Sequence, residues 1–333
     1  MYNSLIKKIA VSVIIVTVLI GGSACGNLKE DETEGIKKVD FTEYYRDWET
    51  NEIKIPNIVI DEIIFENIDK SIFQKELPIY KSLKCDIKDG HAEELLDKFS
   101  FDSNYRIYPR EGYDLYRDAK SNELEYMGKG FFNFRPNGYD YNNSDLTANM
   151  SDDEAKAMAA EYASEFKLSG DYIVMDFCGS LGAQDGQLLQ KIVTYSRKLN
   201  DYRVMNIGSG RYPGMSSLSF WLSDSGINMI RSSERDYEEN GVYTTISKEK
   251  AIEKMLNFSK HKDVYIGELG ESINFSVKNQ VKINSAELAY FDDIDPSIEG
   301  FDVLPGYFFE GEISDEIGNS TFFYALVGAI ELE

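Results

Sequence analysis

Histidine is scarce in this 333-residue sequence, which contains only His91 and His261. No His-Glu-x-x-His or Cys-x-x-Cys spacing occurs, which excludes the usual zinc signatures. A Gly-x-Ser-x-Gly nucleophile elbow and a Gly-x-x-x-x-Gly-Lys-Ser/Thr phosphate loop are also missing. Because the sequence has no catalytic or cofactor motif, we predict that the protein is not an enzyme and carries no cofactor.

Basic residues are also in short supply, with 35 Lys and Arg against 58 Asp and Glu and a formal net charge of −23. Nucleic-acid binding depends on clustered lysines and arginines that neutralise phosphates, and the body of the chain has no such cluster. The same charge disfavours an anionic headgroup surface. We therefore predict no nucleic-acid partner, whereas cationic partners and a purely solubilising role of the charge both remain open.

Cysteine occurs three times, and the first one follows a secretory signal pattern. Lys7 and Lys8 precede an uncharged apolar run over residues 9–20, and small residues then lead into Cys25. The segment Gly21-Gly22-Ser23-Ala24 resembles the lipobox of bacterial lipoproteins, with a glycine where that family usually has leucine. The resemblance implies cleavage before Cys25, a diacylglyceryl anchor on that cysteine, and a position on the extracytoplasmic face of the cell membrane.

An uncleaved membrane-spanning helix is the alternative interpretation of this segment. Residues 9–24 are 16 uncharged positions, whereas a spanning helix needs ~20. We therefore expect a signal peptide over residues 1–24 and 309 residues after cleavage. That length favours two domains or a run of repeated units.

Cys85 and Cys178 are the two remaining cysteines. In an exported protein two such thiols can pair as a disulfide. Both also lie in strand-like runs where a small buried apolar residue fits equally well. The sequence leaves both interpretations open.

Helix starts divide the rest of the chain. Residues 25–50 are polar and acidic, and we expect a flexible tether there. Asp89, Ser151 and Ser247 each begin a helical pattern that strand patterns follow. We expect an N-terminal unit over 51–150, a central helix with an antiparallel meander over 151–245, and a C-terminal unit over 246–333. The predicted fold class is therefore α+β, with tandem units of a helix packed on an antiparallel sheet.

Some local patterns are specific enough to predict single contacts. Ser151 and Glu154 have the spacing of a capping box at the start of the central helix. The apolar stripe of that helix consists of Ala155, Met158, Ala159, Tyr162 and Phe166. Residues 218–222 alternate as in a half-buried strand, and a phase slip at Asn284-Ser285 predicts a β-bulge.

The C-terminal unit also resembles a known kind of module. Residues 246–254, 281–290 and 304–309 are similar to the helix, the strand and the L-x-P-x-W/Y strand of PepSY-like modules in uncharacterised lipoproteins of Gram-positive anaerobes. Residues 194–199 and 218–230 resemble the paired strands before such a module. Similar tandem modules occur in extracytoplasmic regulators of the Yyc two-component system, from which this chain departs by its lipid signal. The resemblance implies a non-enzymatic binding or regulatory role and assigns no catalytic residue.

An acidic loop near the C-terminus offers oxygen ligands for a hard cation such as calcium. The candidate ligands are Asp292, Asp293, Asp295, Glu299 and Asp302. They fail the EF-hand template, because Ile298 stands at the glycine position and Leu304 at the closing glutamate. A solvated hairpin loop without metal is the alternative.

An aromatic group beside Pro136-Asn137-Gly138 is a candidate binding surface for glycan or peptide. It consists of Phe131, Phe132, Phe134, Tyr139 and Tyr141. Such residues also fill sheet cores, and the sequence does not distinguish the two. We predict a membrane-anchored extracytoplasmic lipoprotein that binds a protein or peptide partner in the cell envelope. The alternative function is a cell-surface hydrolase or glycan-binding protein.

Overall fold

The computed structural model of the chain describes twelve parts of the sequence, with 172–182 described by the backbone alone. These parts are residues 40–45, 50, 52–83, 91–128, 130–138, 146–165, 172–182, 188–206, 218–233, 236–267, 278–292 and 302–331. The chain divides into two compact units, Met1–Glu34 and Gly35–Glu333, and all described residues belong to the second. Within these residues, no helix is both long enough and apolar enough to span a membrane.

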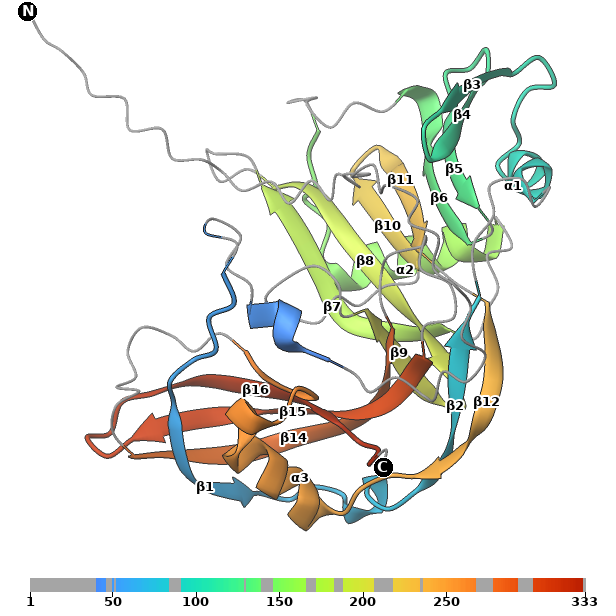
Figure 1. Cartoon of the computed structure of the whole chain (residues 1–333). Helices are drawn as coiled ribbons and strands as arrows, with labels where there is room; N and C mark the ends of the chain where they lie inside the picture. Colours follow the sequence, from blue (N-terminus) through green and yellow to red (C-terminus); the bar gives the residue numbers. More distant parts are fainter. Residues whose placement is uncertain are drawn as a thin grey trace, which may run out of the picture. The chain divides into compact units, whose positions relative to one another are not determined.

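Strands account for most of the regular structure in the described residues, and short helices for the rest (Figure 1). The strands are β1 (Val59–Phe65), β2 (Glu76–Ser82), β3 (Arg106–Arg110), β4 (Tyr113–Arg117), β5 (Glu123–Gly128), β6 (Phe131–Arg135), β7 (Tyr172–Gly182), β8 (Leu188–Leu199), β9 (Tyr202–Asn206), β10 (Leu218–Ser223), β11 (Gly226–Ser233), β12 (Tyr237–Thr244), β13 (Val264–Ile266), β14 (Lys278–Asp292), β15 (Asp302–Asp315) and β16 (Ser320–Gly328). The α-helices are α1 (Ala92–Lys98), α2 (Asp152–Glu165) and α3 (Lys248–Leu256). The 3-10 turns are η1 (Thr42–Tyr45), η2 (Lys70–Ile72), η3 (Pro136–Gly138) and η4 (Phe258–Lys260).

Hydrogen-bonded pairing joins these strands into one mixed sheet. Its main order is β12-β2-β15-β14-β9-β8-β10-β11-β6-β5-β4-β3, and β1, β7, β13 and β16 branch from it. β14 runs parallel to β1 and to β9, while its pairing with β15 is antiparallel. β9 also pairs with β8, so this short strand connects the C-terminal strands to the central ones.

The predicted α+β class is wrong, because the described chain is mostly β and has only three α-helices. α1 and α2 pack into one core over a common face of the sheet. The two helices therefore do not belong to two separate helix-on-sheet units. β1 and β2 come early in the chain, yet they pair with β14, β12 and β15. Strands therefore combine across the sequence, and the predicted series of helix-on-sheet tandem units does not form.

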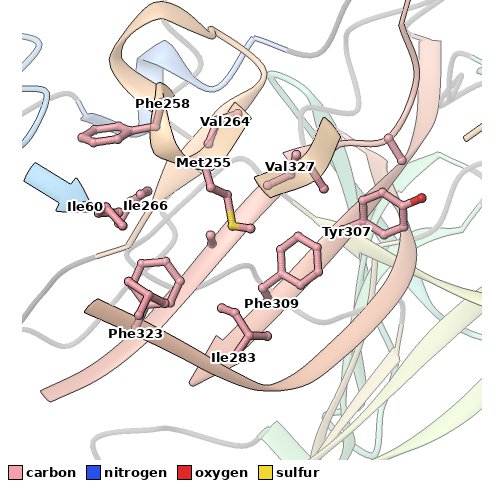
Figure 2. Close-up of a cluster of buried hydrophobic side chains, with 14 of the residues drawn as sticks. Ile60, Met255, Phe258, Val264, Ile266, Ile283, Tyr307, Phe309, Phe323 and Val327 are labelled. Atoms are coloured by element: carbon pink, nitrogen blue, oxygen red, sulfur yellow. The ribbon is translucent and has the colours of Figure 1, made fainter. Parts of the chain in front are cut away.

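The C-terminal core lies between α3 and the strands beneath it. α3 contacts β1, β13 and β16. Ala251 and Met255 of α3 are fully buried, and Figure 2 shows Met255 among Phe309, Phe323 and Val327. The predicted helix start at Ser247 is confirmed, because the Lys250 amide donates to the Ser247 hydroxyl at 3.2 Å.

A second core lies beneath α1 and α2. The predicted stripe of α2 is confirmed in part: Ala155 and Ala159 are fully buried there, and Met158 and Tyr162 are half-buried at its border. Phe166 and Asp89, the predicted start of the first helix, lie outside the described residues. α1 has His91 at its N-cap. Residues Leu218, Phe220 and Leu222 join the same core, as their alternation predicted.

Hydrogen bonds confirm the predicted capping box at α2. The Ser151 amide donates to Oε2 of Glu154 at 2.7 Å, and the Glu154 amide donates to Oγ of Ser151 at 3.2 Å. The predicted bulge in β14 is also confirmed, since the register with β15 shifts between Ile283 and Ser285.

A third core holds residues from the start of the described chain. Phe41 is fully buried and Tyr45 is 9% exposed, although both fall in the range expected to be a tether. The Phe41 amide donates to the Lys262 carbonyl at 2.7 Å, and the Ile266 amide donates to the Tyr45 hydroxyl at 2.8 Å. These contacts fix the segment against β13 and the face of β14 that carries Phe291.

Two hairpins of the sheet close with the same five-residue turn. In the β4–β5 turn, Asp118 accepts from the amides two and four residues on, at 2.9 and 2.8 Å, and from Nδ2 of Asn122 at 2.9 Å. In the β15–β16 turn, Asp315 accepts from the amides of Ile317 and Asn319 and from Nδ2 of Asn319, at 3.1, 2.9 and 2.9 Å. Both turns have the spacing Asp-x-x-x-Asn, and in both the aspartate accepts hydrogen bonds from the turn amides.

Candidate partner-binding surface

The acidic loop proposed for calcium is described only at its two ends. Asp292 is 2% exposed and accepts from the Tyr237 hydroxyl at 2.7 Å, while Asp302 is 8% exposed and accepts from Nδ2 of Asn240 at 3.3 Å. Both carboxylates therefore bind side chains of β12. Asp293, Asp295 and Glu299 lie outside the described residues. Within those residues, no three His, Cys, Asp or Glu side chains gather as metal ligands, so a calcium site stays a prediction.

The aromatic candidates that the structure describes are core residues. Phe131, Phe132 and Phe134 are 5%, 4% and 2% exposed. Phe134 stacks on Phe99, with ring centroids 4.0 Å apart, at the border of α1. The three phenylalanines therefore do not form an exposed stacking surface. Tyr139 and Tyr141 lie outside the described residues.

The cysteine predictions fall largely outside what the structure describes. Cys25 and Cys85 are not among the described residues. Cys178 lies in β7 opposite Val193, and only its backbone is described. Lipidation of the first cysteine and pairing of the other two therefore stay predictions.

A hollow at the start of α2 contains two carboxylates. It is lined by Asn149, Met150, Glu154, Met158 and Asp224. Hydrogen bonds from Ser151 lower the pKa of Glu154, and bonds from Thr147 and Asn149 lower the pKa of Asp224. A glycosidase requires one carboxyl with a raised pKa as its acid, so this pair favours structural caps over acid catalysis.

Among the described acidic residues with a resolved pKa shift, Glu287 of β14 is the one whose pKa is raised. Burial raises its pKa and nearby Glu310 raises it further, while Arg203 of β9 lowers it. Oε2 of Glu287 lies 2.5 Å from a guanidinium nitrogen of Arg203, which also lies over the Phe308 ring at 5.7 Å. The carboxylate is thus engaged in an ion pair, and the hollow described above lies on other elements.

The hairpin of β3 and β4 has one core face and one outer face. On the core side, Tyr116 of β4 is buried beneath α1, whereas its partner Ile107 of β3 is 50% exposed. Because side chains alternate along a strand, Arg106, Tyr108 and Arg110 project from the opposite face. Their partners across the hairpin share that face. We call this surface the arginine–tyrosine face, and its members are Arg106, Tyr108, Arg110, Tyr113, Leu115 and Arg117.

Positive charge on the arginine–tyrosine face is only partly neutralised. Arg117 forms an ion pair with Glu123 of β5, and Glu123 also lies 3.7 Å from a guanidinium nitrogen of Arg135. Arg106 and Arg110 are exposed and have no carboxylate at ion-pair distance among the described residues. Within the part of the chain that the structure describes, the face therefore presents two guanidinium groups without an ion pair, on a chain whose formal net charge is −23.

The register places two of these arginines directly opposite each other. Arg106 of β3 pairs with Arg117 of β4, and like charges in that position destabilise a sheet. Tyr108 and Leu115 form the next pair on the same face and are half-buried. Arginine and tyrosine are enriched at protein interfaces, with tyrosine supplying apolar area and arginine directed hydrogen bonds. The arrangement is thus suited to a partner that carries negative charge.

Sequence reasoning missed this face. The signal was present as the alternation Arg106-Ile107-Tyr108-Pro109-Arg110, which places both arginines on one side of a strand. Counting charges over the whole chain hid it, because the count does not separate paired from unpaired arginines.

Comparisons with known proteins do not identify the chain. No protein-family profile matches the sequence, and no curated protein matches it. The resemblance to PepSY-like modules and to extracytoplasmic Yyc regulators therefore stays a prediction.

Proposed function

We propose that the protein is a lipid-anchored, non-catalytic protein of the extracytoplasmic membrane face that binds a protein or peptide partner in the cell envelope through the arginine–tyrosine face. The observation that carries this proposal is the pair of unneutralised arginines, Arg106 and Arg110, on one side of β3. Arg106 lies opposite Arg117, and this like-charge pair costs folding stability that a bound carboxylate would offset.

The anchor in this proposal is supported by the signal pattern that ends at Cys25. A single acyl chain holds a protein only reversibly, whereas a diacylglyceryl group supplies two chains. Cys25→Ala should therefore move the protein from the membrane fraction to the medium. Retention of this variant in the membrane fraction would disprove the lipid anchor and leave the binding face to be judged separately.

Site-specific photo-cross-linking on intact cells tests the binding role. We would replace Tyr108 with p-benzoylphenylalanine, and place the same probe at Phe322, which is 51% exposed on β16, as the control. The expected result is a discrete protein adduct at position 108 and not at 322, which is lost when Arg106 and Arg110 are both changed to Glu. Identical adducts at the two positions, or none at 108, would refute binding at this face.

The alternative role of cell-surface hydrolase predicts turnover of a glycan or peptide library by the purified protein. Glu154 and Asp224, the two carboxylates of the hollow beside α2, are poor candidates for a catalytic acid, because the pKa values of both are lowered. Glu287 is the acid to test, because its pKa is raised. Turnover that Glu287→Gln abolishes, while Glu312→Gln on β15 leaves it intact, would replace the binding proposal with the enzymatic one.

A further inference from the structure

We infer that the arginine–tyrosine face accepts an extended peptide segment that has two carboxylates four residues apart and an apolar residue midway between them. This inference rests on the proposed binding function and adds the chemistry of the partner. Three properties of the hairpin support it: the spacing of the two arginines, the apolar pair between them, and the amide hydrogen that Pro109 lacks at the edge of β3.

The spacing of the free arginines selects an extended partner. Arg106 and Arg110 are four residues apart on one face of a strand, and a rise of 3.4 Å per residue separates their Cα atoms by about 14 Å. In an extended peptide, residues i and i+4 share a face at this same separation. In a helix, same-face positions i+7 and i+11 lie about 10 and 16 Å along the axis, so neither matches.

The two guanidinium groups and the pair between them fix the chemistry. A free guanidinium presents a planar fork of donors that matches a carboxylate in bidentate geometry. Between the arginines lies Tyr108, with Leu115 beside it on β4, and both are half-buried. The residue midway between the two acids would rest on this pair, and it should therefore be apolar.

The edge of β3 directs the partner onto the face. Arg110 and Tyr113 close a two-residue loop, which makes them a hydrogen-bonded pair, so the next pair, Pro109 and Asp114, is not hydrogen-bonded. The nitrogen of Pro109 thus lies at the free edge, where it has no hydrogen to donate. At this edge Ile107 offers an amide and a carbonyl, whereas Pro109 offers a carbonyl alone, so an added strand would lose one ladder hydrogen bond. Side-chain contacts on the arginine–tyrosine face carry no such loss.

Electrostatics within the hairpin favour the same partner. Arg106 lies directly opposite Arg117. Arg117 forms an ion pair with Glu123, and Arg135 lies close to the same glutamate. A carboxylate bound at Arg106 would add the negative charge that this row lacks. A cationic partner would meet two free guanidinium groups and be repelled.

Fluorescence anisotropy with labelled peptides tests this inference on the full-length protein in neutral detergent at low salt. The first peptide has the core Glu-Thr-Leu-Thr-Glu, the second has the same composition with adjacent acids, Glu-Glu-Thr-Leu-Thr, and the third has lysines in place of glutamates. We expect the first to bind at least about tenfold more tightly than the other two, since about 1.4 kcal/mol corresponds to tenfold in affinity. Equal binding of the first and second peptides would overturn the inferred spacing.

Charge reversal provides the matched control. The double variant Arg106→Glu with Arg110→Glu should lose the acidic peptide and gain the lysine peptide, and Arg106→Gln with Arg110→Gln should bind neither. The control, Lys81→Glu with Lys98→Glu, makes the same change in net charge at exposed lysines of β2 and α1 and should retain the acidic peptide. The melting temperature of the arginine variants should not fall, because they remove a like-charge pair. Equal loss of binding in the control would overturn the inference.

Linear inorganic polyphosphate separates this partner from a general polyanion. Tighter binding of polyphosphate than of the first peptide, abolished by the same arginine variants, would overturn the inference in favour of a phosphate polymer. If the cross-link at position 108 persists while every peptide fails, the partner chemistry is wrong and the binding function stands. If the cross-link is absent, the binding function itself fails.

Discussion

Phe41→Ala tests whether the segment before β1 is part of the folded core. Phe41 is fully buried, and its ring packs edge-to-face against the ring of Phe291, with the ring centroids 5.5 Å apart. Truncating such a buried phenylalanine costs about 3–5 kcal/mol, through lost transfer free energy and the cavity that remains. Unfolding entropy is about 2.1 cal/mol/K per residue, so a body of roughly 300 residues should melt about 6 °C lower after a loss of ~4 kcal/mol.

Thermal melting and amide hydrogen exchange measure this effect together. Melting reports the global loss, and exchange at the Ile266 amide, which donates to Tyr45, reports whether the segment itself detaches. Phe322→Ala is the control, because this phenylalanine is 51% exposed, and it should shift melting by no more than about 1–2 °C. If both variants melt alike and exchange at Ile266 is unchanged, the docking of Phe41 is refuted.

The remaining predictions concern turns and close contacts. Burial raises the pKa of Asp118, but its hydrogen bonds outweigh burial and lower the pKa below 3.8. The ionised carboxylate should therefore stabilise the fold above the unfolded-state pKa, and this stabilisation should disappear as pH falls through the folded-state pKa. Acid unfolding should show this loss in the wild type and not in Asp118→Asn. In urea unfolding, Asp315→Ala should cost about 1–3 kcal/mol, whereas Ile317→Lys should change stability by less than about 0.5 kcal/mol, because the matching position of the β4–β5 turn is lysine. Gly306→Ala should lower the melting temperature, because its Cβ would lie 1.9 Å from the Phe291 ring.

Local features of the fold could be predicted from the sequence because each depends on residues close together in the chain. The capping box needs only Ser151 and Glu154, three positions apart, and its two hydrogen bonds form as expected. The bulge after Ile283 breaks a period of two, so it leaves a trace in the alternation itself. Side-chain patterns of this kind identify which face of an element is buried.

Strand pairing could not be predicted, because it depends on residues far apart. Val59 and Asn279 are 220 positions apart, yet Nδ2 of Asn279 donates to the Val59 carbonyl where β1 runs parallel to β14. The apolar residues of β1 are compatible with any neighbour that buries the same face. The same limit explains the wrong fold class: helix starts were visible, but nothing local showed that α1 and α2 would cover one continuous sheet.

The candidate face was hidden for a related reason. Arg106 and Arg110 are easy to read in the sequence, but their significance depends on which other arginines are neutralised. Arg117, Arg135 and Arg203 are all engaged by glutamates that lie on neighbouring strands. Those pairings follow from the sheet register, so the unpaired arginines can be recognised only after the strands are placed.

The negative net charge of the chain and the positive charge of the arginine–tyrosine face therefore select the same class of partner in different ways. At physiological ionic strength the Debye length is about 8 Å, so charges farther apart than this are largely screened. The excess of acids on the chain therefore repels mainly partners whose negative charge extends over a large surface. A polyanion would place most of its charges over acidic surface, away from Arg106 and Arg110. A short segment with two carboxylates can place both of its charges at those arginines. Repulsion from the rest of the protein thus excludes competitors, which is a common route to specificity.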